Sequence, residues 1–484
     1  METTVKNKTI TAFLWRLLQN AGSQIAGFII SIVLARILMP EEYGTVAMIT
    51  TFTGIAMVFI NTGFSSAIVQ KKDLSDVDIN TMFYSGMLMS FVLYGILFIA
   101  APYIAILYKT PILTDLLRVA SIMVILGAAY SVQQALITRN LQFKKSFIVS
   151  LCGVAVQGVV GITLALEGFG AWALVFASLS NYTVAAILMW CIVSWKPKFV
   201  FSSASFRSMF SFSVKMLMSG ILDSIFNNIR SIIIGIRYSS EDLAYYSKGY
   251  QFPTLIMTQV DGSMTTVLFS SLSGYQSNWN EDGIRVLRRA MKMSMYICAP
   301  LMAGLFAVSD PMIRLLLTDK WADSIIYVRL GAIICLFWPL SAKRHAINSR
   351  GKSGSSLALN FTGKAITLLC LLLTYKHSVQ LMIASTIFSS LIFFIIALFF
   401  YKKHLDYRIR DQIFDVLPSI LLSIFMGAVT YSVMFLRLSS ALTLLIQIPV
   451  GIFVYIIGSI LFRFESFYYL LSTVKSFFLK RRKA

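Results

Sequence analysis

Residues 13–72 read FLWRLLQNAGSQIAGFIISIVLARILMPEEYGTVAMITTFTGIAMVFINTGFSSAIVQKK. Two apolar stretches flank a short polar turn, MPEEYG, at residues 39–44. Each apolar stretch is long enough to cross a bilayer, which takes roughly 20 predominantly apolar residues in a helix. The sequence therefore predicts two consecutive transmembrane helices joined by a tight turn.

The first of these helices carries a polar stripe. Arg16, Asn20 and Gln24 recur at four-residue spacing, which places them on one face of a helix. A charged side chain at bilayer depth is costly, so such a face is expected to turn toward a bundle interior or a water-filled cavity. The alternative is that Arg16 lies near the start of the helix and extends its guanidinium to the headgroups.

The composition places the whole chain in the membrane. Of its 484 residues, 57% are hydrophobic and 13% are charged, whereas a soluble protein carries about 25% charged residues. We expect an all-α, polytopic membrane protein with about fourteen transmembrane helices. The formal charge of +21 does not indicate nucleic-acid binding, because the basic residues recur in short loops and form no recognisable binding module.

The distribution of lysine and arginine predicts the orientation. These residues concentrate in the loops on one side, which the positive-inside rule assigns to the cytoplasm. With an even number of helices, both termini are expected on that side. The five cysteines fall within apolar stretches without metal-ligand spacing, so the sequence predicts neither a metal site nor a disulfide framework.

An internal repeat is visible at an offset of about 200 residues. The turn at residues 40–44 is echoed at residues 240–244, and the first helix has a polar counterpart in the seventh. Two six-helix lobes in a parallel, pseudo-two-fold repeat follow from this pattern. The expected parts are an N-lobe at 1–197, an interfacial linker at 198–213, a C-lobe at 205–405, two further transmembrane helices at 406–463 and a basic amphipathic tail at 464–484.

The seventh helix and its neighbours supply the remaining residues of a candidate substrate cavity. Together with the stripe on the first helix, they are Asn61, Lys215, Asn227, Arg230 and Lys364. Two carboxylates are also placed deep in the chain, Asp223 and Asp261. Bases outnumber acids in this set, which suits an anionic ligand such as a pyrophosphate. For any single base, the alternative to ligand binding is that it pairs with one of these carboxylates and has only a structural role.

Asp223 and Asp261 are the candidates for coupling to an ion gradient. Either carboxylate could bind H⁺ or Na⁺, and either could serve only as a counter-ion for the bases. No cofactor is expected. The sequence also shows no nucleophile motif, paired catalytic carboxylates or phosphate-binding loop, so we expect a transporter and not an enzyme.

Four sequence segments resemble a known family. They are LARILMPEEYG at 34–44, GFSSAIVQKK at 63–72, IIIG at 232–235 and YYSKGYQ at 245–251. Together they are similar to the Wzx-type polysaccharide and O-antigen flippases of the multidrug/oligosaccharidyl-lipid/polysaccharide superfamily, in the branch that includes colanic-acid and teichuronic-acid exporters. The resemblance implies two six-helix lobes around a central cationic cavity, followed by two C-terminal helices.

The resemblance also implies a function. Such a protein would move an undecaprenyl-pyrophosphate-linked oligosaccharide across the bacterial inner membrane by alternating access, with membrane lipid, a polysaccharide polymerase and glycosyltransferases as partners. This chain departs from the family at one position, where relatives often carry an acid and this chain has Arg230. A role of that acid in coupling transport to an ion gradient therefore has no counterpart at this position. The alternatives are a multidrug or cation antiporter of the same fold and a non-transporting scaffold for glycan assembly.

Overall fold

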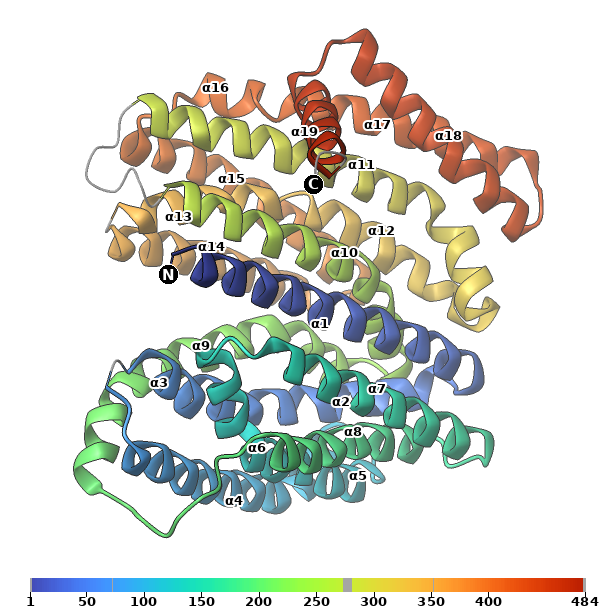
Figure 1. Cartoon of the computed structure of the whole chain (residues 1–484). Coiled ribbons are helices and arrows are strands. Elements are labelled where there is room, and N and C mark those ends of the chain that lie inside the picture. Colours follow the sequence, from blue (N-terminus) through green and yellow to red (C-terminus); the bar gives the residue numbers. More distant parts are fainter. Residues whose placement is uncertain (1, 72, 273–280, 351, 482–484) are drawn as a thin grey trace. The chain divides into compact units, whose positions relative to one another are not determined.

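The computed structural model describes residues 2–71, 73–272, 281–350 and 352–481. Within these ranges the chain forms helices and no strand (Figure 1). Twelve helical segments of the described residues are long and apolar enough to cross a membrane. The prediction of an all-α polytopic membrane protein is therefore confirmed. The chain divides into two compact units, Met1–Ser247 and Lys248–Ala484.

The first unit contains ten helices and the start of an eleventh in its described residues. They are α1 (Glu2–Ile37), α2 (Pro40–Val58), η1 (Phe59–Phe64), α3 (Ser65–Gln70), α4 (Asp76–Leu107), α5 (Leu113–Ala120), α6 (Ile122–Arg139), α7 (Phe143–Leu166), α8 (Ala171–Ile192), α9 (Ser203–Arg237) and the start of α10 (Ser240–Leu272). The helix α1 packs along α7, and α7 packs along α8.

The second unit continues α10 and is built around the long helix α11. Its elements are α11 (Glu281–Leu317), η3 (Asp319–Ser324), α12 (Ile325–Cys335), η4 (Trp338–Ser341), α13 (Ala342–Ser349), α14 (Ser353–Thr374), α15 (Val379–Leu405), α16 (Ile409–Phe414), α17 (Leu417–Ser432), η5 (Val433–Leu436), α18 (Ser440–Leu461) and α19 (Glu465–Arg481). The helices α12, α17 and α18 all pack against α11.

Two long helices, α9 and α10, are not among the twelve apolar segments. They have 35 and 33 residues, which is ample length for a membrane span. Charged residues lower their mean hydropathy, as expected for helices that turn a polar face away from lipid. The two further spans predicted from the sequence fall on these helices, and the total of about fourteen includes them.

The segment before α9 is tied to the start of α4. The backbone N–H of Lys198 donates to Asn80 Oδ1 at 2.6 Å, and that of Ser202 donates to Thr81 Oγ1 at 3.1 Å. Ser205 Oγ then donates to the buried carboxylate of Asp78 at 2.7 Å. The first turns of α9 therefore occupy most of the stretch predicted as a linker at 198–213, and the predicted lobe boundaries stay a prediction.

The two turns that suggested the repeat share one local structure. Before α2, Glu42 Oε2 accepts the backbone N–H of Met39 at 2.7 Å, and before α10, Asp242 Oδ2 accepts that of Ser239 at 3.2 Å. A carboxylate three residues into a helix that caps the preceding N–H is a capping-box interaction, and its charge favours the helix N-terminus. Both turns therefore start their helices in the same way.

These two turns also lie against each other. A Cβ atom placed on Gly44 would lie 1.7 Å from the carbonyl oxygen of Ser240. Only glycine allows a helix and a neighbouring backbone to approach so closely. Gly44 therefore fixes the distance between the start of α2 and the start of α10.

Candidate functional site

The polar stripe predicted on the first helix is present on α1. Arg16, Asn20 and Gln24 are all exposed. A different face of α1 packs on α7, where Gln19 Nε2 donates to Ser146 Oγ at 2.8 Å. The stripe lies beside this contact and stays exposed, and its Arg16 has the guanidinium carbon 5.5 Å from the ring of Phe143 of α7.

Asn61 lies in an unusual segment. It is exposed on η1, a π-helical turn in the middle of the predicted second span. Such turns occur mostly as short interruptions of α-helices and are frequent at functional sites. The turn packs against α9, and a Cβ on Gly220 of α9 would lie 3.4 Å from Thr62 Cγ2 of η1, so the two elements are close together.

The predicted residues of α9 have different environments. Asp223 and Asn227 are exposed, and Arg230 is half-buried. Since η1 and α9 are packed together, Asn61 and these three residues of α9 lie on adjoining elements of the first unit.

The other three predicted residues are Lys364, Lys215 and Asp261. Lys364 is half-buried on α14 in the second unit. The side chains of Lys215 and Asp261 lie outside the described residues. The grouping of all ten predicted residues around one cavity therefore stays a prediction.

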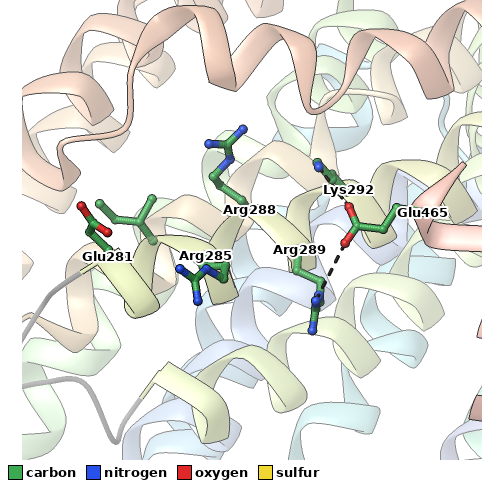
Figure 2. Close-up of a pocket in the computed structure, with 7 residues that line it drawn as sticks. Glu281, Arg285, Arg288, Arg289, Lys292 and Glu465 are labelled. Atoms are coloured by element: carbon green, nitrogen blue, oxygen red, sulfur yellow. Dashed lines mark hydrogen bonds and ion pairs between the residues drawn. The ribbon is translucent and has the colours of Figure 1, made fainter. Parts of the chain in front are cut away.

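A pocket of about 400 Å³ lies along α11 in the second unit (Figure 2). Its lining residues are Glu281, Ile284, Arg285, Arg288, Arg289, Lys292 and Glu465. The four bases recur at spacings of three and four residues, so they share one side of α11. Figure 2 shows Glu465, from the first turn of α19, reaching toward Lys292 and Arg289.

Carboxylates match most of these bases. Arg288 Nε lies 2.8 Å from Asp415 Oδ2, and Arg288 also lies 3.4 Å from Asp411. Lys292 Nζ lies 3.6 Å from Asp415 and 3.3 Å from Glu465. Because these acids come from α16, the α16–α17 turn and α19, the pocket is first of all a joint that fastens the C-terminal helices to α11.

A buried lysine lies beside this joint. Lys343 of α13 is 1% exposed, and its Nζ donates to Gln412 Oε1 at 2.9 Å. The rings of Tyr401 and Tyr407 lie 5.3 and 5.5 Å from the ammonium group. Burial lowers the pKa of Lys343 from 10.5 to about 7, and the charge of Asp415 partly opposes this shift. Nothing in the sequence pattern distinguished this lysine from the other loop bases.

We expect Lys343 to make the stability of the protein depend on pH. Between about pH 7 and pH 10.5 the unfolded chain binds a proton at this lysine that the folded protein does not, so the free energy of unfolding should rise with pH across that window. Lys343→Met should remove this rise. Thermal unfolding in detergent from about pH 6.5 to 9.5 measures it. Lys402→Met, at an exposed lysine, should keep the slope, and an unchanged slope in Lys343→Met would contradict the assignment.

One family model and several named relatives match this chain. The model of a family described as "Polysaccharide biosynthesis protein" matches residues 33–326. The succinoglycan biosynthesis transport protein ExoT of Rhizobium meliloti is 27% identical over 66% of this chain and 65% of its own length. The teichuronic acid biosynthesis protein TuaB of Bacillus subtilis is 25% identical over 58% of this chain. The chain thus spans 65% and 59% of the lengths of these two curated relatives.

Solved structures share the fold. The lipid II flippase MurJ in an inward closed conformation matches 93% of this chain and 99% of its own, with a TM-score of 0.76 and 16% identity. A multidrug resistance MATE family transporter of the MOP superfamily in an inward-facing conformation matches 78% of this chain and 94% of its own, with a TM-score of 0.64 and 14% identity. These two solved structures are thus of a flippase and of a multidrug transporter.

Proposed function

Because the chain belongs to the polysaccharide biosynthesis protein family, we propose that it is a flippase for an undecaprenyl-pyrophosphate-linked oligosaccharide. The cargo would pass from the cytoplasmic to the outer leaflet of the bacterial inner membrane, for assembly of a surface polysaccharide. Alternating access is the mechanism that the shared fold supports. Both termini would lie in the cytoplasm, and glycosyltransferases and a polysaccharide polymerase would act before and after transport.

The observation that carries the proposal is the exposed polar face on a helix of membrane-spanning length. Arg16, Asn20 and Gln24 line up on α1 and are accessible to a ligand. An arginine at such a position needs an anionic or polar partner, and a guanidinium binds phosphate oxygens in bidentate geometry. In this proposal Arg16 binds the pyrophosphate, and the two amides contact phosphate or sugar.

The second half of the proposed site comes from the later helices. Arg230, Lys215 and Lys364 would complete the cationic lining, and Asn61 and Asn227 would add amide contacts. Asp223 or Asp261 would bind the H⁺ or Na⁺ whose gradient drives transport. The exposure of Asp223 supports this role, since a coupling carboxylate must be reached by the ion.

Removing two of the arginines tests the proposal. The double variant Arg16→Ala/Arg230→Ala should lower surface glycan output at least about tenfold at equal membrane levels, because each charge-assisted bond to phosphate is worth about 1.5–3 kcal/mol. Arg207→Ala is the matched control, since this exposed arginine lies at the start of α9, outside the proposed lining. Normal output from a well-expressed double variant would rule out the cationic site.

An antiporter of multidrug or cationic substrates is the second candidate, and the likeness to MATE transporters favours it. That likeness is at the level of the fold. A substrate site for cations should be acidic, whereas the predicted residues contain more bases than acids. A deletion strain with altered drug susceptibility and normal surface glycan would favour this candidate over the flippase.

A further inference from the structure

The start of α7 meets α1 at residues 15 and 16 in a crossed pair of cation–aromatic contacts. Lys144 Nζ of α7 lies 5.7 Å from the ring of Trp15, and the guanidinium carbon of Arg16 lies 5.5 Å from the ring of Phe143. Two consecutive residues on one helix thus contact two consecutive residues on the other. We call these four residues the crossed corner.

The crossed corner is held in place by neighbouring contacts. The rings of Trp15 and Phe147 lie 5.7 Å apart. One turn along α1, Gln19 donates to Ser146, which also receives a hydrogen bond from Gln134 Nε2 of α6 at 3.1 Å. These contacts hold the backbone around Arg16 and Lys144 in place, and both side chains remain exposed.

The helices around the corner carry almost no negative charge. The helix α7 packs on α1, α6 and α8, and the sequences of these four helices contain a single carboxylate, Glu2. Lys145 adds a further base beside Lys144. Nearby, Arg139 donates to the carbonyl oxygens of Ile68 and Lys71, so it serves the end of α3. Within these four helices, the charge of the corner thus has no carboxylate beside it, in contrast to the bases along α11.

An apolar stripe begins directly beside Lys144. Ile148, Leu151 and Val159 follow it at helical spacing on the same face of α7, and they are 42%, 42% and 65% exposed. This surface has bases and aromatic rings at one end and exposed aliphatic side chains along its length. It is therefore complementary to a lipid molecule, which has a phosphate headgroup and acyl chains. The positive-inside rule assigns the loop before α7 to the cytoplasmic side, where anionic headgroups attract lysine and arginine.

We propose that the crossed corner and the stripe below it bind an anionic phospholipid of the cytoplasmic leaflet. The headgroup phosphate contacts Lys144 and Lys145 beside the ring of Trp15, and an acyl chain lies along Ile148, Leu151 and Val159. A pyrophosphate-linked cargo has related chemistry. The occupant here is the phospholipid, because the exposed stripe is aliphatic and lies on α7, which carries none of the residues proposed to contact the cargo.

Binding of phosphatidylglycerol tests the proposal. In native mass spectrometry of the full-length protein in detergent, the wild type should retain phosphatidylglycerol in preference to phosphatidylcholine. Lys144→Gln/Lys145→Gln should weaken that preference about tenfold or more, because each base near an anionic surface contributes roughly fivefold. Lys144→Arg/Lys145→Arg should keep it, since the charge is retained. Neither lysine belongs to the proposed cargo site.

The matched control is an exposed lysine pair elsewhere, Lys402→Gln/Lys403→Gln, which has Asp406 nearby in sequence and should change the preference less than twofold. Equal lipid retention by Lys144→Gln/Lys145→Gln and the wild type would overturn the proposal. So would a loss of farnesyl pyrophosphate binding in that variant with phosphatidylglycerol retention intact, because the corner would then serve the cargo. Glycan output from the Arg16→Ala/Arg230→Ala variant judges the proposed function separately.

Discussion

Replacing Asp415 by alanine is expected to lower the free energy of unfolding by about 3–5 kcal/mol, because it leaves several partners of a buried carboxylate without their anion. The Asp415 side chain is 3% exposed, and its two oxygens accept hydrogen bonds from Arg288 at 2.8 and 3.0 Å. The hydroxyl of Tyr407 donates to the same carboxylate at 2.5 Å. Loss of this group should loosen the junction of α16 and α17 with α11.

Unfolding in detergent with increasing denaturant or temperature measures this loss. The control is Asp282→Ala, which removes an ion pair to Arg285 that is 3.1 Å long and largely exposed on both sides. Exposed pairs are worth about 0–1 kcal/mol, so this variant should behave almost like the wild type. If the two variants lose equal stability, the buried position of Asp415 is not what makes it important.

Gly44→Ala is expected to destabilise the protein through the addition of a single methyl group. The added Cβ would lie 1.7 Å from the carbonyl oxygen of Ser240 and 3.0 Å from its Cα, so backbone would have to move. The Ser239 turn resists such movement, because Asp242 N–H donates to Ser239 Oγ at 3.0 Å. Overpacking against backbone should cost about 1–3 kcal/mol or more and should impair glycan output beyond the loss in protein level.

The same helix offers a matched control. A Cβ on Gly54 of α2 would have no atom within 4 Å. Gly54→Ala should therefore be neutral or should stabilise α2 by up to about 1 kcal/mol, since alanine is the better helix former. Thermal unfolding and expression-normalised glycan output measure both variants. Equal behaviour of Gly44→Ala and Gly54→Ala would show that the close approach to Ser240 is not required.

Much of the fold could be predicted because hydropathy determines which segments enter a bilayer. The apolar stretches around residues 39–44 predicted α1 and α2, and the turn between them begins α2 at Pro40. The polar composition of α9 and α10 weakened the same signal, although both segments form long helices. Hydropathy could not reveal the π-helical turn at η1, because the average hydropathy of a span does not depend on the hydrogen-bond pattern of its backbone.

The candidate site was predictable only in part. Four-residue spacing put Arg16, Asn20 and Gln24 on one face of a helix, because helix geometry follows directly from sequence separation, and all three are exposed on α1. Contacts between residues that are far apart in the chain produce no comparable spacing pattern in the sequence. The partnership of Arg288 with Asp415 spans 127 residues, and Lys343 becomes special only through the aromatic rings packed around it. Such properties arise from tertiary packing and not from local pattern.

The π-helical turn at η1 has a consequence for how chains of this family should be aligned. A hydrogen bond from residue i to i+5 encloses one residue more than the i to i+4 bond of an α-helix. The six residues Phe59–Phe64 therefore contain the equivalent of a one-residue insertion, and every side chain after them is rotated by about 100° relative to an uninterrupted helix. Relatives without this turn should need a single-residue gap there, and patterns of lipid-facing positions counted through it would fall out of phase.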